Sequence, residues 1–249
     1  MVNFFSAEWR GAPFVLFEPT HLLMLGLVAL CILALTRFRN ASEVMRARMR
    51  VALALALWIN ESAWHIWKYS IGQWTIQEML PLHLCSILIW LSGFMLLFKN
   101  YTIYEFAYFL GIGAGINALL TPDVGIYNFP HFRYIQTFIS HGLLVAAAIY
   151  MTVVEGFRPT WKSLLRVAVG INLYMFVLYF FNDAIGSNYM MVNAKPAVRS
   201  LYDLMPPWPY YLIVVELLGL AISLLLYLPF AIKDWRVRKS AFVLNNPTS

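Results

Sequence analysis

Charged residues are scarce in this chain. Only 12% of its 249 residues are Asp, Glu, Lys or Arg, whereas 61% are hydrophobic. A soluble globular domain carries about 25% charged and about 45–50% apolar residues. So many apolar side chains cannot be buried inside a water-soluble particle of this size. The composition therefore excludes a disordered chain and an ordinary cytosolic enzyme, and it predicts an all-α polytopic membrane protein.

Cysteine is nearly absent as well. Cys31 and Cys85 are the two in the chain, and both lie in apolar runs. Their expected positions along two helices differ in depth by about 10 Å. A disulfide requires Cα atoms within about 7 Å of each other, so we predict no bridge and exclude a disulfide scaffold.

The first twenty residues have no basic segment leading into a short apolar core, which a cleavable signal peptide requires. We expect the first apolar run to remain as a membrane helix. Seven apolar segments follow one another along a single domain, residues 1–249, and each is near the ~20 residues needed to cross a bilayer. They cover residues 20–36, 50–70, 81–98, 103–121, 134–154, 163–183 and 209–232.

The basic residues are distributed unequally between the connections. Thirteen of the 18 fall on one side. These are Arg37, Arg39, Arg46, Arg48, Arg50, Lys99, Arg158, Lys162, Arg166, Lys233, Arg236, Arg238 and Lys239. The opposite side has Arg10, Lys68, Arg133, Lys195 and Arg199. The positive-inside rule predicts an N-terminus outside and a C-terminus in the cytoplasm, with the protein in the plasma membrane. The net charge of +6 reflects this topology, so no nucleic-acid partner is expected.

Glycine and proline mark three further features. Gly111 and Gly115 on the fourth segment form a small-xxx-small pattern, which favours close helix packing over phosphate binding. Two outer connections, residues 121–133 and 184–209, are rich in proline. Each connection is either a lid or binding element, or a loop packed over the helix ends.

Polar residues recur in the outer half of six predicted helices, where each ionisable group costs at least ~2.5–3.5 kcal/mol. They are Glu61, His65, His83, Cys85, Asn117, Tyr134, His141, Asn172, Asp183 and Glu216. Their common depth predicts one shared cavity open toward the outer leaflet. Individual alternatives remain: Glu61 with His65 as a structural ion pair, His83 and His141 bonded to backbone carbonyls, and Glu216 paired with Lys68 or Arg133.

Cys85 is a candidate nucleophile. Pro81 suits the first position of the third helix, which would place Cys85 near the positive end of the helix dipole, where a thiolate is favoured. A histidine in the cavity would be the base, and Asn117, Tyr134 or helix amides would stabilise an oxyanion. The alternative is that Cys85 is only a small buried side chain.

Several separated motifs carry a family resemblance. They are Leu80-Pro81-Leu82-His83-Leu84-Cys85-Ser86, Thr121-Pro122-Asp123, Phe129-Pro130-His131, Phe138-Ile139-Ser140-His141-Gly142, Asn188-Tyr189-Met190, Lys195-Pro196 and Pro207-Trp208-Pro209. The chain thereby resembles the YwaF-type seven-helix membrane proteins of bacteria from about residue 55 to 232. That family is remotely similar to a eukaryotic seven-helix phospholipid acyltransferase that uses a membrane cysteine. More distantly, it is similar to intramembrane threonine hydrolases of fatty-acid esters of hydroxy fatty acids.

The resemblance implies acyl chemistry on membrane lipids, with a phospholipid or lysophospholipid as partner and no cofactor. The nucleophile would be Cys85, and His141 would take and return the proton. His83, Asn117 or Tyr134 would orient groups or stabilise charge, Glu61 and His65 would shape the polar wall, and Glu216 would balance the histidines. Asn172 and Asp183 would complete the cavity.

Two other classes of protein fit the same residues. A zinc-dependent hydrolase of ceramidase type could use His65, His83 and His141 as ligands, although no closely spaced histidine pair occurs. A transporter or small-molecule binding protein would use the intramembrane charges as a substrate path. Bound zinc would identify the first class, and flux in proteoliposomes the second.

Overall fold

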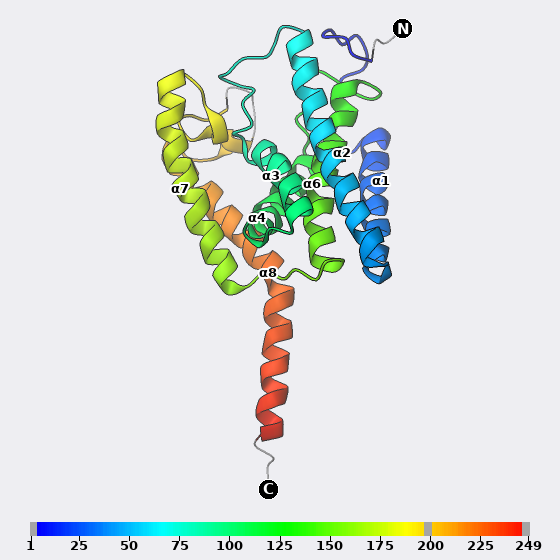
Figure 1. Ribbon diagram of the computed structural model, residues 1–249. Helices are drawn as coiled ribbons and strands as arrows, with labels where there is room; N and C mark the ends of the chain where they lie inside the picture. Colours follow the sequence, from blue (N-terminus) through cyan, green and yellow to red (C-terminus); the bar gives the residue numbers. More distant parts are fainter. Residues whose placement is uncertain (1–3, 197–200, 246–249) are drawn as a thin grey trace.

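The fold is a bundle of helices, seen in a computed structural model that describes residues 4–196 and 201–245 (Figure 1). No strand occurs among these residues. The long helices are α1 Pro19–Thr36, α2 Glu43–Ser70, α3 Leu84–Phe98, α6 Phe132–Val153, α7 Trp161–Ile185 and α8 Tyr210–Asn245. Between α3 and α6, the helices α4 Tyr101–Phe106 and α5 Ile112–Leu120 join through the π-helical segment η2 Ala107–Gly111. Short 3₁₀ turns are η1 Arg37–Asn40, η3 Tyr189–Met191 and η4 Leu201–Leu204.

Each of the seven predicted segments corresponds to one helix or to the continuous run α4–η2–α5. Five of these are long and apolar enough to cross a membrane: Pro19–Asn40, Tyr101–Leu120, Phe132–Val153, Trp161–Ile185 and Tyr210–Val237. The other two helices, α2 and α3, do not meet both conditions, each for its own reason. Helix α2 is long but carries many charged residues, and α3 is apolar but has 15 residues.

The start of α3 differs from the sequence prediction. Helix α3 begins at Leu84 and not at Pro81, because the amide of Leu82 bonds the carbonyl of Leu80 in a tight turn. His83 is the N-cap residue, with extended backbone angles. The predicted helix boundary was therefore wrong by three residues, and Cys85 occupies the second position of the helix.

Helix α6 is the centre of the bundle, and α1, α2, α3 and α5 pack around it. Its core-facing positions include a run of small side chains that admits close neighbours. A Cβ atom added to Gly115 of α5 would lie 2.7 Å from Val145 and 3.3 Å from the His141 carbonyl, so this glycine lets α5 approach α6. The packing role predicted for the glycine seam is confirmed at this position.

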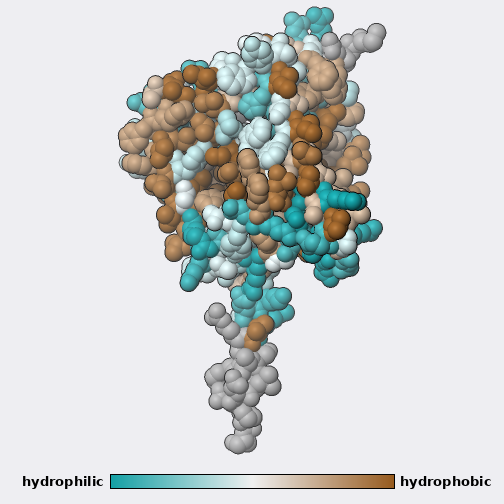
Figure 2. All heavy atoms as spheres, viewed as in Figure 1, coloured by the Kyte–Doolittle hydropathy of each residue, from teal (hydrophilic) through white to brown (hydrophobic). Residues whose placement is uncertain are grey.

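Helices α7 and α8 pack less extensively than α6, and their windows of highest hydropathy are only 17% and 11% buried. Large apolar side chains cover their outer surfaces, as they do on α1. Figure 2 shows broad apolar areas on the visible face of the bundle, with hydrophilic residues gathered at the end from which α8 projects. So many exposed apolar side chains on long apolar helices require lipid as their solvent, so the chain is an integral membrane protein.

A network of charges ties three helices together at that hydrophilic end. The Glu155 carboxylate, 2% exposed, lies 2.7 Å from Arg50 of α2 and 2.7 Å from Lys99 at the end of α3. Glu43 contacts the same two cations at 3.7 and 3.2 Å. Because a buried carboxylate needs compensating charge, this network fixes the ends of α2, α3 and α6 relative to one another.

Candidate functional site

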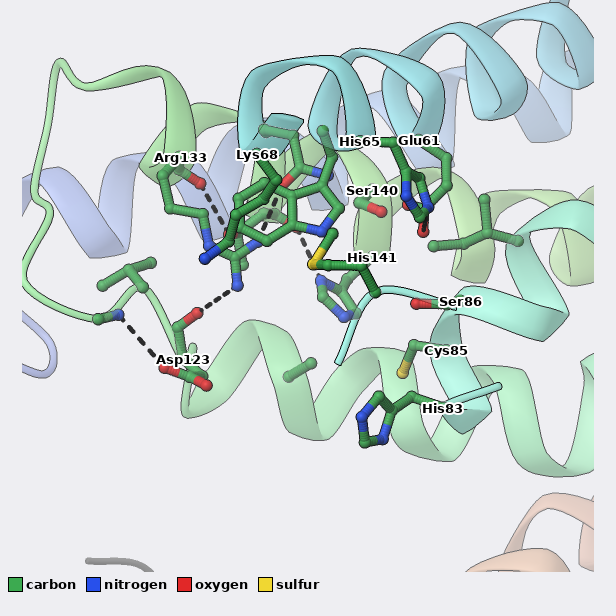
Figure 3. Close-up of a pocket in the computed structure, with 18 of the residues that line it drawn as sticks. Glu61, His65, Lys68, His83, Cys85, Ser86, Asp123, Arg133, Ser140 and His141 are labelled. Carbon is green, nitrogen blue, oxygen red and sulfur yellow. Dashed lines mark hydrogen bonds and ion pairs between the residues drawn. The ribbon is translucent and has the colours of Figure 1, made fainter. Parts of the chain in front are cut away.

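A cavity of about 660 Å³ lies at the end of the bundle opposite the charge network. The last turns of α2, the start of α3, the end of α5 and the first turns of α6 form its walls. Six of the predicted polar residues line it: Glu61, His65, His83, Cys85, Asn117 and His141. They come from four separate helical segments, and Figure 3 shows five of them, all but Asn117, around one space. The structure therefore brings these six residues together.

Four other predicted residues lie elsewhere, because the predicted depth was right for a cavity but the helix face was not. Tyr134 points into a core cluster with Phe138 and is fully buried. Asn172 is exposed on α7 and bonds its own helix at the Ala168 carbonyl. Asp183 and Glu216 are also exposed, on the peripheral helices α7 and α8. Glu216 forms no ion pair with Lys68 or Arg133 in the described structure, so that alternative does not hold.

Cys85 lies in the first turn of α3. The amides of Leu84, Cys85 and Ser86 have no hydrogen-bond acceptor among the described residues, and His83 supplies no side-chain cap. Free amides at a helix N-terminus attract developing negative charge. Cys85 therefore lines the cavity beside a set of unused backbone donors. No hydrogen bond joins its thiol to a histidine in the described part of the chain, and Cys31 is a free, exposed cysteine on α1.

His141 has a defined tautomer. Its Nδ1 atom lies 2.8 Å from the carbonyl oxygen of Thr137, one turn earlier on α6. A carbonyl can only accept a hydrogen bond, so the proton of a neutral His141 ring resides on Nδ1. The Nε2 atom then carries a lone pair and can accept a proton from a group in the cavity.

His83 and His65 have the opposite tautomer. The amide of Met190 donates to His83 Nδ1 at 3.3 Å, and the indole of Trp74 donates to His65 Nδ1 at 3.1 Å. Both partners can only donate, so the neutral rings carry their proton on Nε2. His83 and His65 are therefore hydrogen-bond donors. Among the described residues, His141 is the one cavity histidine whose unprotonated nitrogen has no hydrogen-bond partner.

Glu61 is a buried carboxylate in the wall of the cavity, 2% exposed. The Nε2 atom of His65 lies 3.9 Å from its Oε1 atom. The hydroxyl groups of Ser86 and Ser140 lie beside the same carboxylate (Figure 3). This arrangement agrees with the predicted Glu61–His65 pair and adds two serines that join α3 and α6 to it.

Sequence reasoning missed several cavity residues, among them Trp64, Gln136 and Ser140. It considered Lys68 and Arg133 as topology signals and as partners of Glu216, but not as part of the cavity wall. The helical spacing of Trp64 with Glu61 was an available signal, because residues at i and i+3 share a face. Arg133 is the second residue of α6, and its side chain donates to the carbonyl of Asp123 in the preceding connection. That contact has no signature in the sequence.

The connection between α7 and α8 reaches the cavity through Met191. The Tyr189 hydroxyl donates to the Ile76 carbonyl at 2.7 Å and accepts from the Leu80 amide at 2.9 Å. The ring of Tyr189 also packs edge-on against His83, with ring centroids 5.1 Å apart. This segment is thus packed over the helix ends and also forms part of the cavity wall.

The other outer connection also contributes residues to the cavity, and the N-terminal segment packs against it. His131, the N-cap residue of α6, donates through Nε2 to the Ser6 carbonyl at 2.9 Å and accepts at Nδ1 from the Arg133 amide at 3.0 Å. Its ring stacks on Tyr127 at 4.1 Å. Burial lowers the pKa of His131 below its ordinary value, and the bond to Ser6 partly offsets this effect. A neutral His131 therefore fixes the start of α6 and the Arg133 backbone.

The ligands suggested for zinc do not form a cluster. His65, His83 and His141 all line the cavity, but among the described residues no three His, Cys, Asp or Glu side chains are grouped so that they could hold a metal ion. Two of the three imidazoles also have Nδ1 occupied by a donor, with Nε2 carrying the proton.

Fold and site together define a helical integral membrane protein with a polar cavity enclosed near one end of an apolar bundle. The chain belongs to the TMEM164 family, whose sequence profile matches residues 16–227. Comparison with curated proteins and comparison with solved structures gave no match. The resemblance to YwaF-type proteins and to the phospholipid acyltransferase is not confirmed by these comparisons.

Proposed function

We propose that the protein transfers or hydrolyses acyl groups of membrane lipids, with Cys85 as the nucleophile and His141 as the general base. One observation carries this proposal. In the described part of the chain, a thiol beside helix amides with no acceptor lines the same cavity as a histidine whose Nε2 atom has no hydrogen-bond partner. Nucleophile, base and oxyanion donors are the three parts that acyl transfer requires.

The reaction begins when an acyl ester enters the cavity. His141 Nε2 takes the thiol proton, and Cys85 Sγ attacks the ester carbonyl carbon. The oxyanion is stabilised by the free amides of Cys85 and Ser86 and by the Nε2–H group of His83. The ester C–O bond then breaks, and the leaving alcohol receives the proton from His141, which leaves a thioester on Cys85.

The second half of the cycle reverses these roles. The hydroxyl group of an acceptor lipid, or water, gives its proton to His141 and attacks the thioester. The C–S bond breaks, and the proton returns to the thiolate of Cys85. An acceptor alcohol makes the protein an acyltransferase, whereas water makes it a hydrolase. In either case His141 moves one proton in each direction per half-reaction.

The thiol and His141 must approach each other for this proton transfer, because no hydrogen bond joins them among the described residues. Catalytic hydrogen bonds commonly tighten when a substrate binds.

We also propose that the cavity opens toward the outer leaflet of the plasma membrane. The support is the excess of basic residues at the end from which α8 projects, opposite the cavity.

The proposal is tested by incubating purified protein with a lipid ester that carries a labelled acyl chain. Rapid quenching followed by mass spectrometry of peptides should find the acyl group on Cys85. A peptide containing Cys31 is the internal control, since Cys31 lies on the exposed face of α1. Release or transfer of label with no acyl-Cys85 at any time point would contradict the covalent mechanism.

A further inference from the structure

Two cations flank one indole ring in the cavity. The guanidinium carbon of Arg133 lies 4.0 Å from the centroid of Trp64, and the Lys68 ammonium nitrogen lies 5.3 Å from it. All three residues line the cavity, and Figure 3 shows Lys68 and Arg133 near each other at one end of the view. Two like charges on one ring repel each other, and an anion bound between them would relieve this repulsion.

Neither cation is neutralised by an ion pair. Arg133 donates to the side-chain oxygen of Gln136 at 2.9 Å and to the backbone carbonyl of Asp123 at 2.8 Å. Lys68 donates to the side-chain oxygen of Gln73 at 2.8 Å. All three acceptors are neutral, and no carboxylate of the described residues forms a salt bridge with either cation. The guanidinium has five N–H donors, so it retains capacity for a further acceptor.

Three carboxylates line the same cavity and restrict what kind of anion fits. Glu61 faces His65 and two serines, and the Asp123 carboxylate accepts the Gly125 amide at 3.2 Å. Glu78 lies on the exposed α2–α3 connection. These charges oppose a free phosphate dianion more than a singly charged phosphodiester. Of these two anions, the phosphodiester is therefore the one that fits better beside three carboxylates.

The cations also lie at a useful distance from the proposed reaction centre. The Arg133 side chain runs along α6 to Gln136, which is five residues, or about 7.5 Å of helix rise, from His141. In Figure 3, His141 lies between the Arg133–Lys68 end and the Cys85–His83 end. A phosphate and the nearest acyl ester of a glycerolipid are separated by only a few bonds, which matches this spacing.

We propose that Arg133, Lys68 and Trp64 form a subsite for the phosphodiester of a glycerophospholipid headgroup. The guanidinium and ammonium groups bind the phosphate oxygens, and the indole holds both cations in place. The position of the ester next to Cys85 rests on the proposed acyl chemistry, whereas binding of the phosphate does not.

The test compares two lipids that share one acyl ester and differ in the headgroup. Dodecanoyl lysophosphatidylcholine and monododecanoylglycerol are titrated separately into purified full-length protein below their critical micelle concentrations. Wild-type protein should bind the lysophospholipid about tenfold more tightly than the monoacylglycerol. Lys68→Gln and Arg133→Gln should each remove most of this difference and leave the affinity for the monoacylglycerol unchanged.

Lys195→Gln is the matched control. Lys195 is also near an aromatic ring, that of Tyr211 at 6.0 Å, but it does not line the cavity. Its substitution should leave the tenfold preference intact. If Arg133→Gln does not yield folded protein, Lys68→Gln still decides the question, because the Lys68 side chain bonds only an exposed glutamine side chain among the described residues.

The subsite would be overturned if wild-type protein bound the two lipids with equal affinity, or if Lys68→Gln kept the wild-type preference for the lysophospholipid. It would also be overturned if Lys195→Gln lost as much of this preference as Lys68→Gln. Inorganic phosphate that binds as tightly as the lysophospholipid would also overturn the assignment to a lipid headgroup. Cys85→Ser separates the two proposals, since it should bind the lysophospholipid like wild type while forming no acyl-enzyme. Failure of the headgroup preference leaves acyl-Cys85 detection as an independent test of the proposed function.

Discussion

His141 and Thr137 are joined across one turn of α6 by a bond of 2.8 Å from ring nitrogen to backbone carbonyl. The bond uses the backbone of the same helix, so it persists when side chains elsewhere in the cavity change. It fixes the ring plane and keeps the basic Nε2 atom free. The sequence left open whether His141 bonds a carbonyl or acts in catalysis. The geometry makes the two roles compatible, because the bond from Nδ1 to the carbonyl leaves Nε2 unprotonated and able to act as a base.

Replacement of the thiol should stop turnover. Cys85→Ser removes the ionisable sulfur, and an alcohol is far harder to deprotonate, so we expect no measurable lysophospholipid acylation or fatty-acid release. The fold should be unchanged, since one oxygen replaces one sulfur. Cys31→Ser, outside the cavity, should keep wild-type activity. Full activity of Cys85→Ser would end the covalent mechanism.

Replacement of the base should slow chemistry without loss of binding. We expect His141→Ala to lower the rate of acyl-Cys85 formation by about 10²–10⁴-fold, the usual contribution of general base catalysis. The dissociation constant for a lysophospholipid should stay within a few-fold of the wild-type value. His83→Ala removes a hydrogen-bond donor but keeps the base, so its rate of acyl-Cys85 formation should rise with pH as the wild-type rate does. If this pH dependence were lost in His83→Ala and kept in His141→Ala, His83 would be the base and His141 would not.

The buried ion network should stabilise the opposite end of the bundle. Glu155→Gln leaves Arg50 and Lys99 with only Glu43, so we expect the free energy of unfolding to fall by about 2–4 kcal/mol. The measurement is the thermal midpoint in detergent. Arg10→Gln is the control, because its pair with Glu8 is exposed, at 89% and 77%, and should change the midpoint little.

Close packing of α5 on α6 predicts an asymmetric response to glycine substitution. Gly115→Ala places a methyl group 2.7 Å from Val145, so we expect a loss of about 1–3 kcal/mol in the free energy of unfolding. Gly219→Ala on α8 meets nothing within 4 Å and should be neutral or slightly stabilising. The measurement is the thermal unfolding midpoint in detergent. Equal midpoints for Gly115→Ala and Gly219→Ala would show that α5 and α6 can move apart without loss of stability.

Orientation in the membrane is tested by labelling at the C-terminus. The distribution of basic residues predicts that the tail is cytoplasmic. A cysteine introduced as Pro247→Cys, in a background of Cys31→Ser and Cys85→Ser, should react with an impermeant maleimide only after the membrane is permeabilised. Position 247 lies outside the described residues and therefore serves only as a label site. Reaction in intact cells would invert the orientation and the side of the cavity.

Composition and apolar periodicity were sufficient to predict a helical membrane protein and the approximate position of every long helix. The positions of the helices follow from local properties of the chain, because each lipid-facing segment must be apolar over its own length. The common depth of the polar residues also predicted a cavity near one end. These features are determined by the sequence, since depth along a helix follows from residue number.

Only the tertiary structure decided which side chains face the cavity. Helix rotation is set by packing, and α7 and α8 turn Asn172, Asp183 and Glu216 away from the cavity because these helices lie at the edge of the bundle. The tautomer of His83 depends on Met190, 107 residues later, and the Trp64 indole meets Arg133 of another helix. Such contacts between distant segments depend on how the helices assemble, and no local pattern encodes them.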